Sequence, residues 1–142
     1  MVGNCGSSGE AGNILELLAR HDISPTQQRR QIARILFAKS QHLSAEQILE
    51  QVNREGDLVS KATVYNTLGL FARKGLVREV FVDPTKVFYD SNIKPHHHFY
   101  NVDTGELADI AEGQVSLSGI PLPPEGAQME SVDIVIRLRS KD

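Results

Sequence analysis

The spacing of hydrophobic residues changes near residue 76, and this change constrains the fold more than any other feature of the sequence. Before it, apolar side chains recur every three or four residues, which is the period of an amphipathic helix. After it, "LVREVFV" and "KVFYD" are rich in β-branched and aromatic residues and are joined by the turn signal "DPT". The sequence therefore predicts helices followed by a two-stranded hairpin, which is the order of a winged helix-turn-helix.

Four segments carry the helical spacing. They span residues 13–21, 24–40, 42–56 and 60–75. In the third segment, Ser44 is followed three residues later by Gln47, which is the pattern of a capping box. In the fourth, Ser60 can cap the start of the helix and Gly75 can end it. The residues expected to face the core are Ile14, Leu17, Leu18, Ile32, Ile35, Leu36, Ile48, Leu49, Val52, Val64, Leu68 and Phe71.

The chain changes character again from residue 91. The runs "HHFYNV" and "ELADI" flank "DTG" as a second hairpin, and "ESVDIVIRLRS" alternates as a half-buried strand. We therefore predict an α+β protein with a flexible tail over 1–12, a winged-helix domain over 13–90 and a small α/β domain over 91–142. The second domain is expected to hold a three-stranded antiparallel sheet. Because so thin a sheet buries little, we expect it to pair with a second copy in a homodimer.

Composition narrows the classes of protein further. The chain is 40% hydrophobic and 23% charged, with no apolar run long enough to span a bilayer and no leader-like start, so we expect a cytoplasmic protein without a membrane partner. The only cysteine, Cys5, excludes an intramolecular disulfide and a thiolate zinc cage within one chain.

Charge is distributed unevenly along the chain. Residues 1–90 carry 11 basic and 10 acidic side chains, for a net charge of +1, and residues 91–142 carry 4 and 8, for a net charge of −4. The two sum to the total of −3. Charge alone does not indicate nucleic acid, and the acidic second part suits metal cations or a protein partner.

The fourth helical segment, "SKATVYNTL", holds the position of a recognition helix. The second helix of a helix-turn-helix enters the major groove and its early residues meet base edges. Its exposed candidates for DNA contact are Lys61, Thr63, Tyr65 and Asn66, and Arg29 and Arg30 are placed to contact the DNA backbone from an earlier helix. Asn can read adenine, Thr or Tyr can contact a thymine methyl group, and Lys can hold phosphate. A polar helix face without a partner and a protein-interaction module are the alternatives.

The segment "KPHHHFYNVDTGELADI" (94–110) carries three consecutive histidines. On a strand, His96 and His98 share one face and His97 points to the other. If Thr104-Gly105 forms a two-residue loop, Asp109 shares the face of His98 on the neighbouring strand. Two imidazoles and a carboxylate then form a candidate metal site, whereas a surface or hydrogen-bonded role is favoured for His97. The same ligands describe a non-haem iron oxygenase, but a short chain with three strands leaves little room for a substrate pocket.

Four motifs in this order resemble one known family. They are "SPTQQRRQIARIL", "HLSAEQIL", "KATVYNTLGLF" and "HHHFYNVDTGELADI". The chain resembles the ferric uptake regulator (Fur) superfamily of dimeric, metal-responsive bacterial repressors over about residues 14–142. The "HHHFYN" run, the absence of the family's cysteines and the ending "PEGAQMESVDIVIRLR" are most similar to the iron response regulator (Irr) branch, and then to the peroxide-sensing (PerR) branch.

The resemblance implies a function for several residues. The regulatory metal site matches His42, Asp90, His96, His98 and Asp109, a set without sulfur that suits Fe(II) or Mn(II), with Zn(II) able to substitute. A metal joining the two domains is expected to set both recognition helices for a two-fold symmetric DNA operator. Signals implied by the branches are iron, manganese, peroxide, and haem bound through His96, His97 and His98. The Cys-Pro haem motif of some relatives is missing, because Cys5 is followed by Gly6.

The chain also departs from the family's pattern. Asn101 and Thr104 replace the first Cys-x-x-Cys pair, so no structural zinc held by four cysteines is expected. Ser24 stands where many relatives have a basic residue for the minor groove, and Asn66 stands where many have arginine. Ser116 lacks the carboxylate that a further metal site would need. A metal-buffering or haem-carrying protein that has lost DNA binding is therefore an alternative to a repressor.

Overall fold

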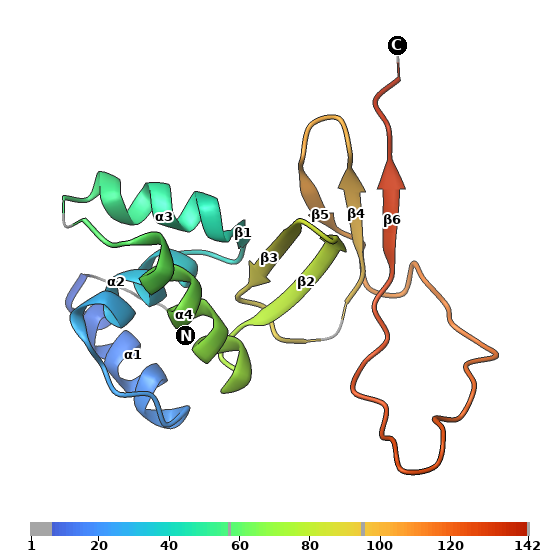
Figure 1. Cartoon of the computed structure of the whole chain (residues 1–142), viewed down its shortest axis with the longest axis horizontal. Coiled ribbons are helices and arrows are strands. Elements are labelled where there is room, and N and C mark those ends of the chain that lie inside the picture. The colour runs from blue at the N-terminus through green and yellow to red at the C-terminus, as the bar shows by residue number, and fades with distance from the viewer. Residues whose placement is uncertain (1–6, 57, 95, 142) are drawn as a thin grey trace. The chain divides into compact units, whose positions relative to one another are not determined.

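The computed structural model describes residues 7–56, 58–94 and 96–141, which form two compact units (Figure 1). The first unit extends to Ile93 and the second begins at Lys94, three residues after the boundary expected from the sequence. Helices gather in the first unit and each unit holds a small sheet, so the predicted α+β class is confirmed. Cys5 lies outside the described residues. None of the described helices has the length and apolar character needed to cross a membrane.

Four helices make up most of the first unit. They are α1 (Ser7–Arg20), α2 (Gln27–Leu36), α3 (Ala45–Arg54) and α4 (Lys61–Arg73). The side chains of Thr26, Ser44 and Ser60 each accept a hydrogen bond from a first-turn backbone N–H, and the predicted capping box between Ser44 and Gln47 is present. Helix α1 begins inside the segment 1–12 that we expected to be a tail. Apolar spacing could not reveal this extension, because the first apolar residue of the stripe is Ile14.

The apolar faces of these helices meet in one core. Helix α2 packs against α1, α3 and α4, and α3 packs against α4. Most residues expected to face inward are buried, and Leu17 and Leu49 are partly buried against the same cluster. The largest fully buried side chain is that of Phe71, on α4. This core fixes α4 against α3, as a helix-turn-helix requires.

The sheet of the first unit includes a strand that the sequence did not indicate. Strands β2 (Arg78–Asp83) and β3 (Lys86–Asp90) form the predicted hairpin, and β1 (His42–Ser44) pairs antiparallel with β3 on its other side. Four helices followed by this hairpin confirm the winged helix-turn-helix. A three-residue strand is too short to show alternation, and this one runs directly into the Ser44 cap of α3.

The second unit contains a mixed sheet in the order β5-β4-β6. Its strands are β4 (His98–Asn101), β5 (Leu107–Asp109) and β6 (Val135–Leu138). Strands β4 and β5 are antiparallel as predicted, but β6 runs parallel to β4, so the expectation of a wholly antiparallel sheet was wrong for β6 (Figure 1). The long connection over 110–134 allows either direction, and alternation within a strand does not specify it. No helix occurs in this unit among residues 94 and 96–141.

Two glycines, one inside α4 and one just after it, should respond oppositely to replacement by alanine. Gly75 follows the helix with φ +78°, and the backbone N–H groups of Gly75 and Leu76 bond to the carbonyls of Ala72 and Phe71, as in a Schellman motif. Nothing lies within 4 Å of an added Cβ, so Gly75→Ala should cost about 1 kcal/mol through backbone strain alone. Gly69→Ala, inside the helix, should stabilise by about 0.5–1 kcal/mol, because its Cβ would meet only the flexible end of Arg73.

Urea denaturation of the two variants beside the parent chain measures both changes in the free energy of unfolding. Equal effects of the two substitutions would contradict the positive φ as the cause.

Candidate functional site

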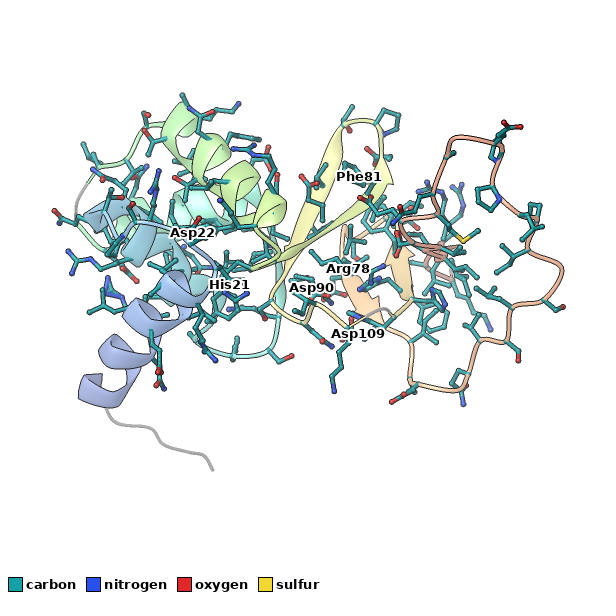
Figure 2. The ribbon with its side chains drawn as sticks, turned by 90° about the horizontal axis from the view of Figure 1, so that it is seen from below. His21, Asp22, Arg78, Phe81, Asp90 and Asp109 are labelled. Atoms are coloured by element: carbon teal, nitrogen blue, oxygen red, sulfur yellow. The ribbon has the colours of Figure 1, made fainter. Side chains whose placement is uncertain are left out.

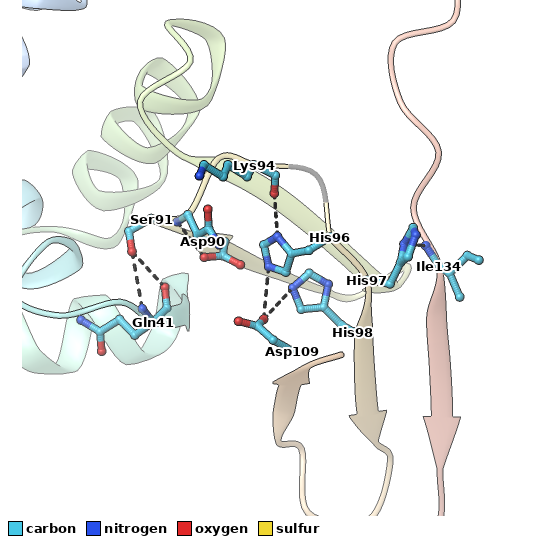
Figure 3. A network of polar contacts seen from close by, with 10 residues as sticks. Gln41, Asp90, Ser91, Lys94, His96, His97, His98, Asp109 and Ile134 are labelled. Carbon is cyan, nitrogen blue, oxygen red and sulfur yellow. Dashed lines mark hydrogen bonds and ion pairs between the residues drawn. The ribbon is translucent and has the colours of Figure 1, made fainter. Parts of the chain in front are cut away.

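Three of the predicted metal ligands converge within the second unit. The register of the β4–β5 hairpin places His98 directly opposite Asp109, and His96 lies just before β4 with its ring 4.4 Å from that of His98. The Nε2 atoms of His96 and His98 lie 3.2 and 3.3 Å from the same atom, Oδ1 of Asp109 (Figure 3). His98 is buried, whereas the carboxylate of Asp109 is half exposed. The three side chains therefore point their donor atoms at one another.

A contact with the Lys94 backbone determines which ring nitrogen of His96 carries the hydrogen. Its Nδ1 lies 2.6 Å from the carbonyl oxygen of Lys94, which can only accept, so Nδ1 carries a hydrogen. In neutral imidazole the other nitrogen, Nε2, then holds a lone pair and faces the carboxylate oxygen of Asp109. Two lone pairs at this distance repel unless a proton or a metal cation lies between them. The donor set of nitrogen and carboxylate oxygen fits Fe(II), Mn(II) or Zn(II), and the Lys94 carbonyl orients the His96 ring as outer-shell partners do.

His97 does not join this cluster. Its Nδ1 accepts a hydrogen bond of 3.1 Å from the backbone N–H of Ile134, and its side chain points toward that residue, away from Asp109 (Figure 3). The backbone of His97 also accepts from Ile110. His97 therefore ties the start of β4 to the segment before β6, which fits the hydrogen-bonded role favoured for it. The three histidines proposed for haem do not converge on one point.

The remaining two candidate ligands form a pair in the first unit. His42 and Asp90 are register partners across β1 and β3, so their side chains leave the same face of that sheet. The Asp90 carboxylate accepts a hydrogen bond of 2.9 Å from the backbone N–H of Asn92, and the His42 ring packs edge-on against Phe88 at 6.4 Å. The backbone N–H of Ser91 donates to the Gln41 carbonyl, which extends the pairing by one residue, and the Ser91 hydroxyl donates to the same carbonyl at 3.3 Å (Figure 3). Strand β1 is thus what brings His42 to Asp90.

The β4–β5 turn is longer than the two-residue loop we expected. Residues 102–105 form it, closed by hydrogen bonds from the N–H of Asn101 to the Glu106 carbonyl and from the N–H of Gly105 to the Asn101 carbonyl. Oδ1 of Asn101 accepts from the backbone N–H groups of Asp103 and Thr104, which stabilises the larger turn. Asn101 also donates to the Ser140 hydroxyl at 3.4 Å. Asn101, which stands where many relatives have the first cysteine of a Cys-x-x-Cys pair, therefore makes hydrogen bonds within the second unit.

The candidates for DNA contact differ in how far their side chains are exposed. Lys61, Tyr65 and Asn66 are exposed on α4, and Arg30 is exposed on α2. Thr63 is half-buried, and its hydroxyl oxygen accepts a hydrogen bond of 2.9 Å from the Ser60 hydroxyl at the helix cap. Arg29 is likewise half-buried and donates to the Ser24 carbonyl at 2.9 Å. The last two side chains are thus already engaged within the protein.

One residue beside the candidate DNA surface was not singled out in the sequence. Glu46, in the first turn of α3, accepts a hydrogen bond of 2.7 Å from the Tyr65 hydroxyl. This contact joins the two helices of the helix-turn-helix, and local sequence patterns carry no signal for it.

The chain is similar in sequence to peroxide-responsive repressors and in fold to ferric uptake regulators. It is 28% identical over 99 residues to the peroxide-responsive repressor PerR of Staphylococcus aureus strain Mu50, which covers 70% of this chain and 67% of that protein. The PerR of strain USA300 is 29% identical over 91 residues, covering 64% and 62%. The matched region thus spans about two thirds or less of these relatives.

Solved structures share the fold. The ferric uptake regulator of Pseudomonas aeruginosa with manganese superimposes with a TM-score of 0.67 at 24% identity, covering 89% of this chain and 97% of that one. The Vibrio cholerae ferric uptake regulator gives 0.69 at 19% identity, covering 89% and 98%. The model of the "Ferric uptake regulator family" matches residues 21–136. Because this match spans both units, the chain belongs to the ferric uptake regulator family.

Proposed function

We propose that this protein is a homodimeric, metal-dependent DNA-binding regulator that represses genes of iron homeostasis or peroxide stress. Membership of the family supports transcription regulation, and the similarity to PerR supports a peroxide or iron signal. The observation that carries the proposal is the convergence of His96, His98 and Asp109, whose two imidazole nitrogens meet one carboxylate oxygen at 3.2 and 3.3 Å, a donor set that suits a divalent cation. A winged helix-turn-helix in the same chain supplies the surface for DNA.

The proposed regulatory site takes ligands from both units. His96, His98 and Asp109 offer three donor atoms, and the cross-strand pair of His42 and Asp90 offers two more. Neither set alone completes the coordination of six that Fe(II) or Mn(II) commonly takes, and neither contains sulfur. We therefore propose that both sets hold one Fe(II) or Mn(II) ion, with Zn(II) able to substitute. A bound ion would supply a cross-link that favours one orientation of the units.

DNA recognition is assigned to α4. Lys61, Tyr65 and Asn66 are exposed near its start, where the recognition helix of this motif meets base edges. Arg30 is exposed to contact phosphate, while Arg29 and Thr63 are half-buried and each hold one hydrogen bond within the protein. Two copies of α4 in a homodimer would read the half-sites of a two-fold symmetric operator.

Haem is the second signal that the sequence suggested. Because His97 is directed to Ile134, haem ligation would fall to His96 or His98, which are also the proposed ligands of the divalent ion. Haem and the divalent ion would then compete for these side chains. Separate titrations with the divalent ion and with haem distinguish the two signals.

The experiment is an anaerobic titration of the protein with Mn(II), followed by fluorescence anisotropy of labelled DNA from its own promoter. We expect binding to promoter DNA to strengthen with Mn(II) and to return to its starting level with a chelator. A second titration with haem monitors its absorption and the same anisotropy. Binding that ignores Mn(II) but changes with haem would replace the proposed signal by haem. Absence of preferential binding to promoter DNA under both conditions would overturn the proposal.

A further inference from the structure

A hydrogen bond between Tyr65 of α4 and Glu46 of α3 joins the two helices of the helix-turn-helix. The Tyr65 hydroxyl donates to Oε2 of Glu46 over 2.7 Å, across 19 residues of sequence. The Lys61 ammonium group lies 5.7 Å from the centroid of the Tyr65 ring. The Tyr65 residue is 37% exposed. A carboxylate therefore lies on the surface proposed to meet DNA, where phosphates would repel it and where its presence calls for a reason.

The hydrogen bond alters the acid–base behaviour of both side chains. Its formation with Glu46 raises the pKa of Tyr65 to about 12, and the bond to Tyr65 lowers the pKa of Glu46, with Lys61 and Lys86 adding to that lowering. At neutral pH the carboxylate is therefore ionised and the phenol is protonated. Because a carboxylate only accepts hydrogen bonds, Tyr65 must be the donor in this pair.

We propose that Glu46 is a positioning residue that determines which bases Tyr65 can recognise. This inference rests on the proposed DNA-binding function. With its only proton directed to Glu46, the Tyr65 oxygen can act toward a base only as an acceptor. In the major groove, cytosine presents only an amino donor and adenine presents an amino donor beside the acceptor N7, whereas guanine presents the acceptors O6 and N7 and thymine the acceptor O4. The pair therefore favours cytosine or adenine opposite the Tyr65 hydroxyl.

Glutamine at position 46 would relax this restriction. Its side chain has nearly the same size, but its amide nitrogen can donate to the Tyr65 oxygen. The hydroxyl proton is then available to the acceptors of guanine and thymine, while adenine can be bound in either state through its amino group or N7. We expect Glu46→Gln to shift the preference at one position of each half-site toward guanine or thymine by about tenfold, the scale of one well-formed hydrogen bond. Loss of a negative charge should also raise affinity for all sequences.

The test is a selection of binding sites from random-sequence duplexes by the full chain with Mn(II) present. The variants are Glu46→Gln, Tyr65→Phe and the double variant. Glu50→Gln is the matched control, because Glu50 is exposed one turn later on α3, bonds to Arg54 at 2.8 Å and carries the same charge. We expect Glu50→Gln to keep the base preference of the parent chain. Tyr65→Phe should lose that preference, and adding Glu46→Gln to it should cause no further change in preference.

An absorbance titration of the tyrosines gives a readout independent of DNA. Glu46→Gln should lower the pKa of Tyr65 from about 12, whereas Glu50→Gln should not. An unchanged tyrosine titration, or a Glu46→Gln variant that selects the same bases as the parent chain, would overturn the inference and leave the DNA-binding function in place. If the parent chain selects no sequence, the proposed function fails and the inference fails with it.

Discussion

Replacing His98 with alanine is expected to reduce the affinity of the protein for Mn(II) by more than about 100-fold, because losing only an outer-shell partner of a metal ligand typically costs 10- to 100-fold. His98 offers Nε2 to the same carboxylate oxygen of Asp109 as His96 does, and its ring is buried. Metal-dependent binding to promoter DNA should disappear with it. Calorimetric titration with Mn(II) and the anisotropy assay measure the two effects.

His21→Ala is the matched control for this substitution. His21 follows α1, is half-buried and bonds through Nδ1 to the Leu17 carbonyl at 2.9 Å, within the winged-helix unit. The His21→Ala variant should lose some stability but keep the Mn(II) affinity of the parent chain. Circular dichroism of both variants separates loss of a ligand from loss of fold. Unchanged Mn(II) affinity in a folded His98→Ala variant would remove His98 from the site.

Local patterns in the sequence were sufficient for the helix caps and for the shared face of His98 and Asp109. The capping box of Ser44 and Gln47 depends on residues three apart, and both of its hydrogen bonds form, at 2.8 and 3.2 Å. His98 and Asp109 share a face because a hairpin keeps alternation across its two strands. The longer turn places Asp109 directly opposite His98, where a two-residue loop would have paired each of them with another residue. In both cases the two side chains lie on the same face of the sheet. Short-range geometry thus carried these predictions.

Contacts between distant segments could not be predicted in this way. Strand β1 has three residues and no visible alternation, so only the family resemblance indicated His42 as a partner of Asp90. The direction of β6 depends on how the connection over 110–134 returns, which the pattern of β6 itself does not contain. The contact of Glu46 with Tyr65 depends on how α3 packs against α4. In each case the deciding information lies in tertiary packing.

Phe71→Ala is expected to destabilise the winged-helix unit by about 3–5 kcal/mol, the usual cost of removing a buried aromatic side chain and leaving a cavity. Phe71 is 0% exposed and is the largest fully buried residue, on the helix proposed to read DNA. For a unit of about this size each kcal/mol lowers the melting temperature by roughly 4–8 °C, so a fall of at least about 12 °C is expected. Such a loss is a large share of a typical total of about 5–15 kcal/mol. Urea and thermal denaturation followed by circular dichroism measure it.

Phe81→Ala removes the same side chain from a different environment. Phe81 lies on the β2–β3 hairpin and is 64% exposed, so its loss should change the free energy of unfolding by only about 0.5 kcal/mol (Figure 2). Comparing two phenylalanines of one unit isolates burial as the cause, because the deleted atoms are identical. Equal destabilisation by the two substitutions would contradict the core described for α4. If only Phe71→Ala melts early, promoter DNA binding should fail near its lowered melting temperature, since α4 presents Tyr65 only while the core beneath it is packed.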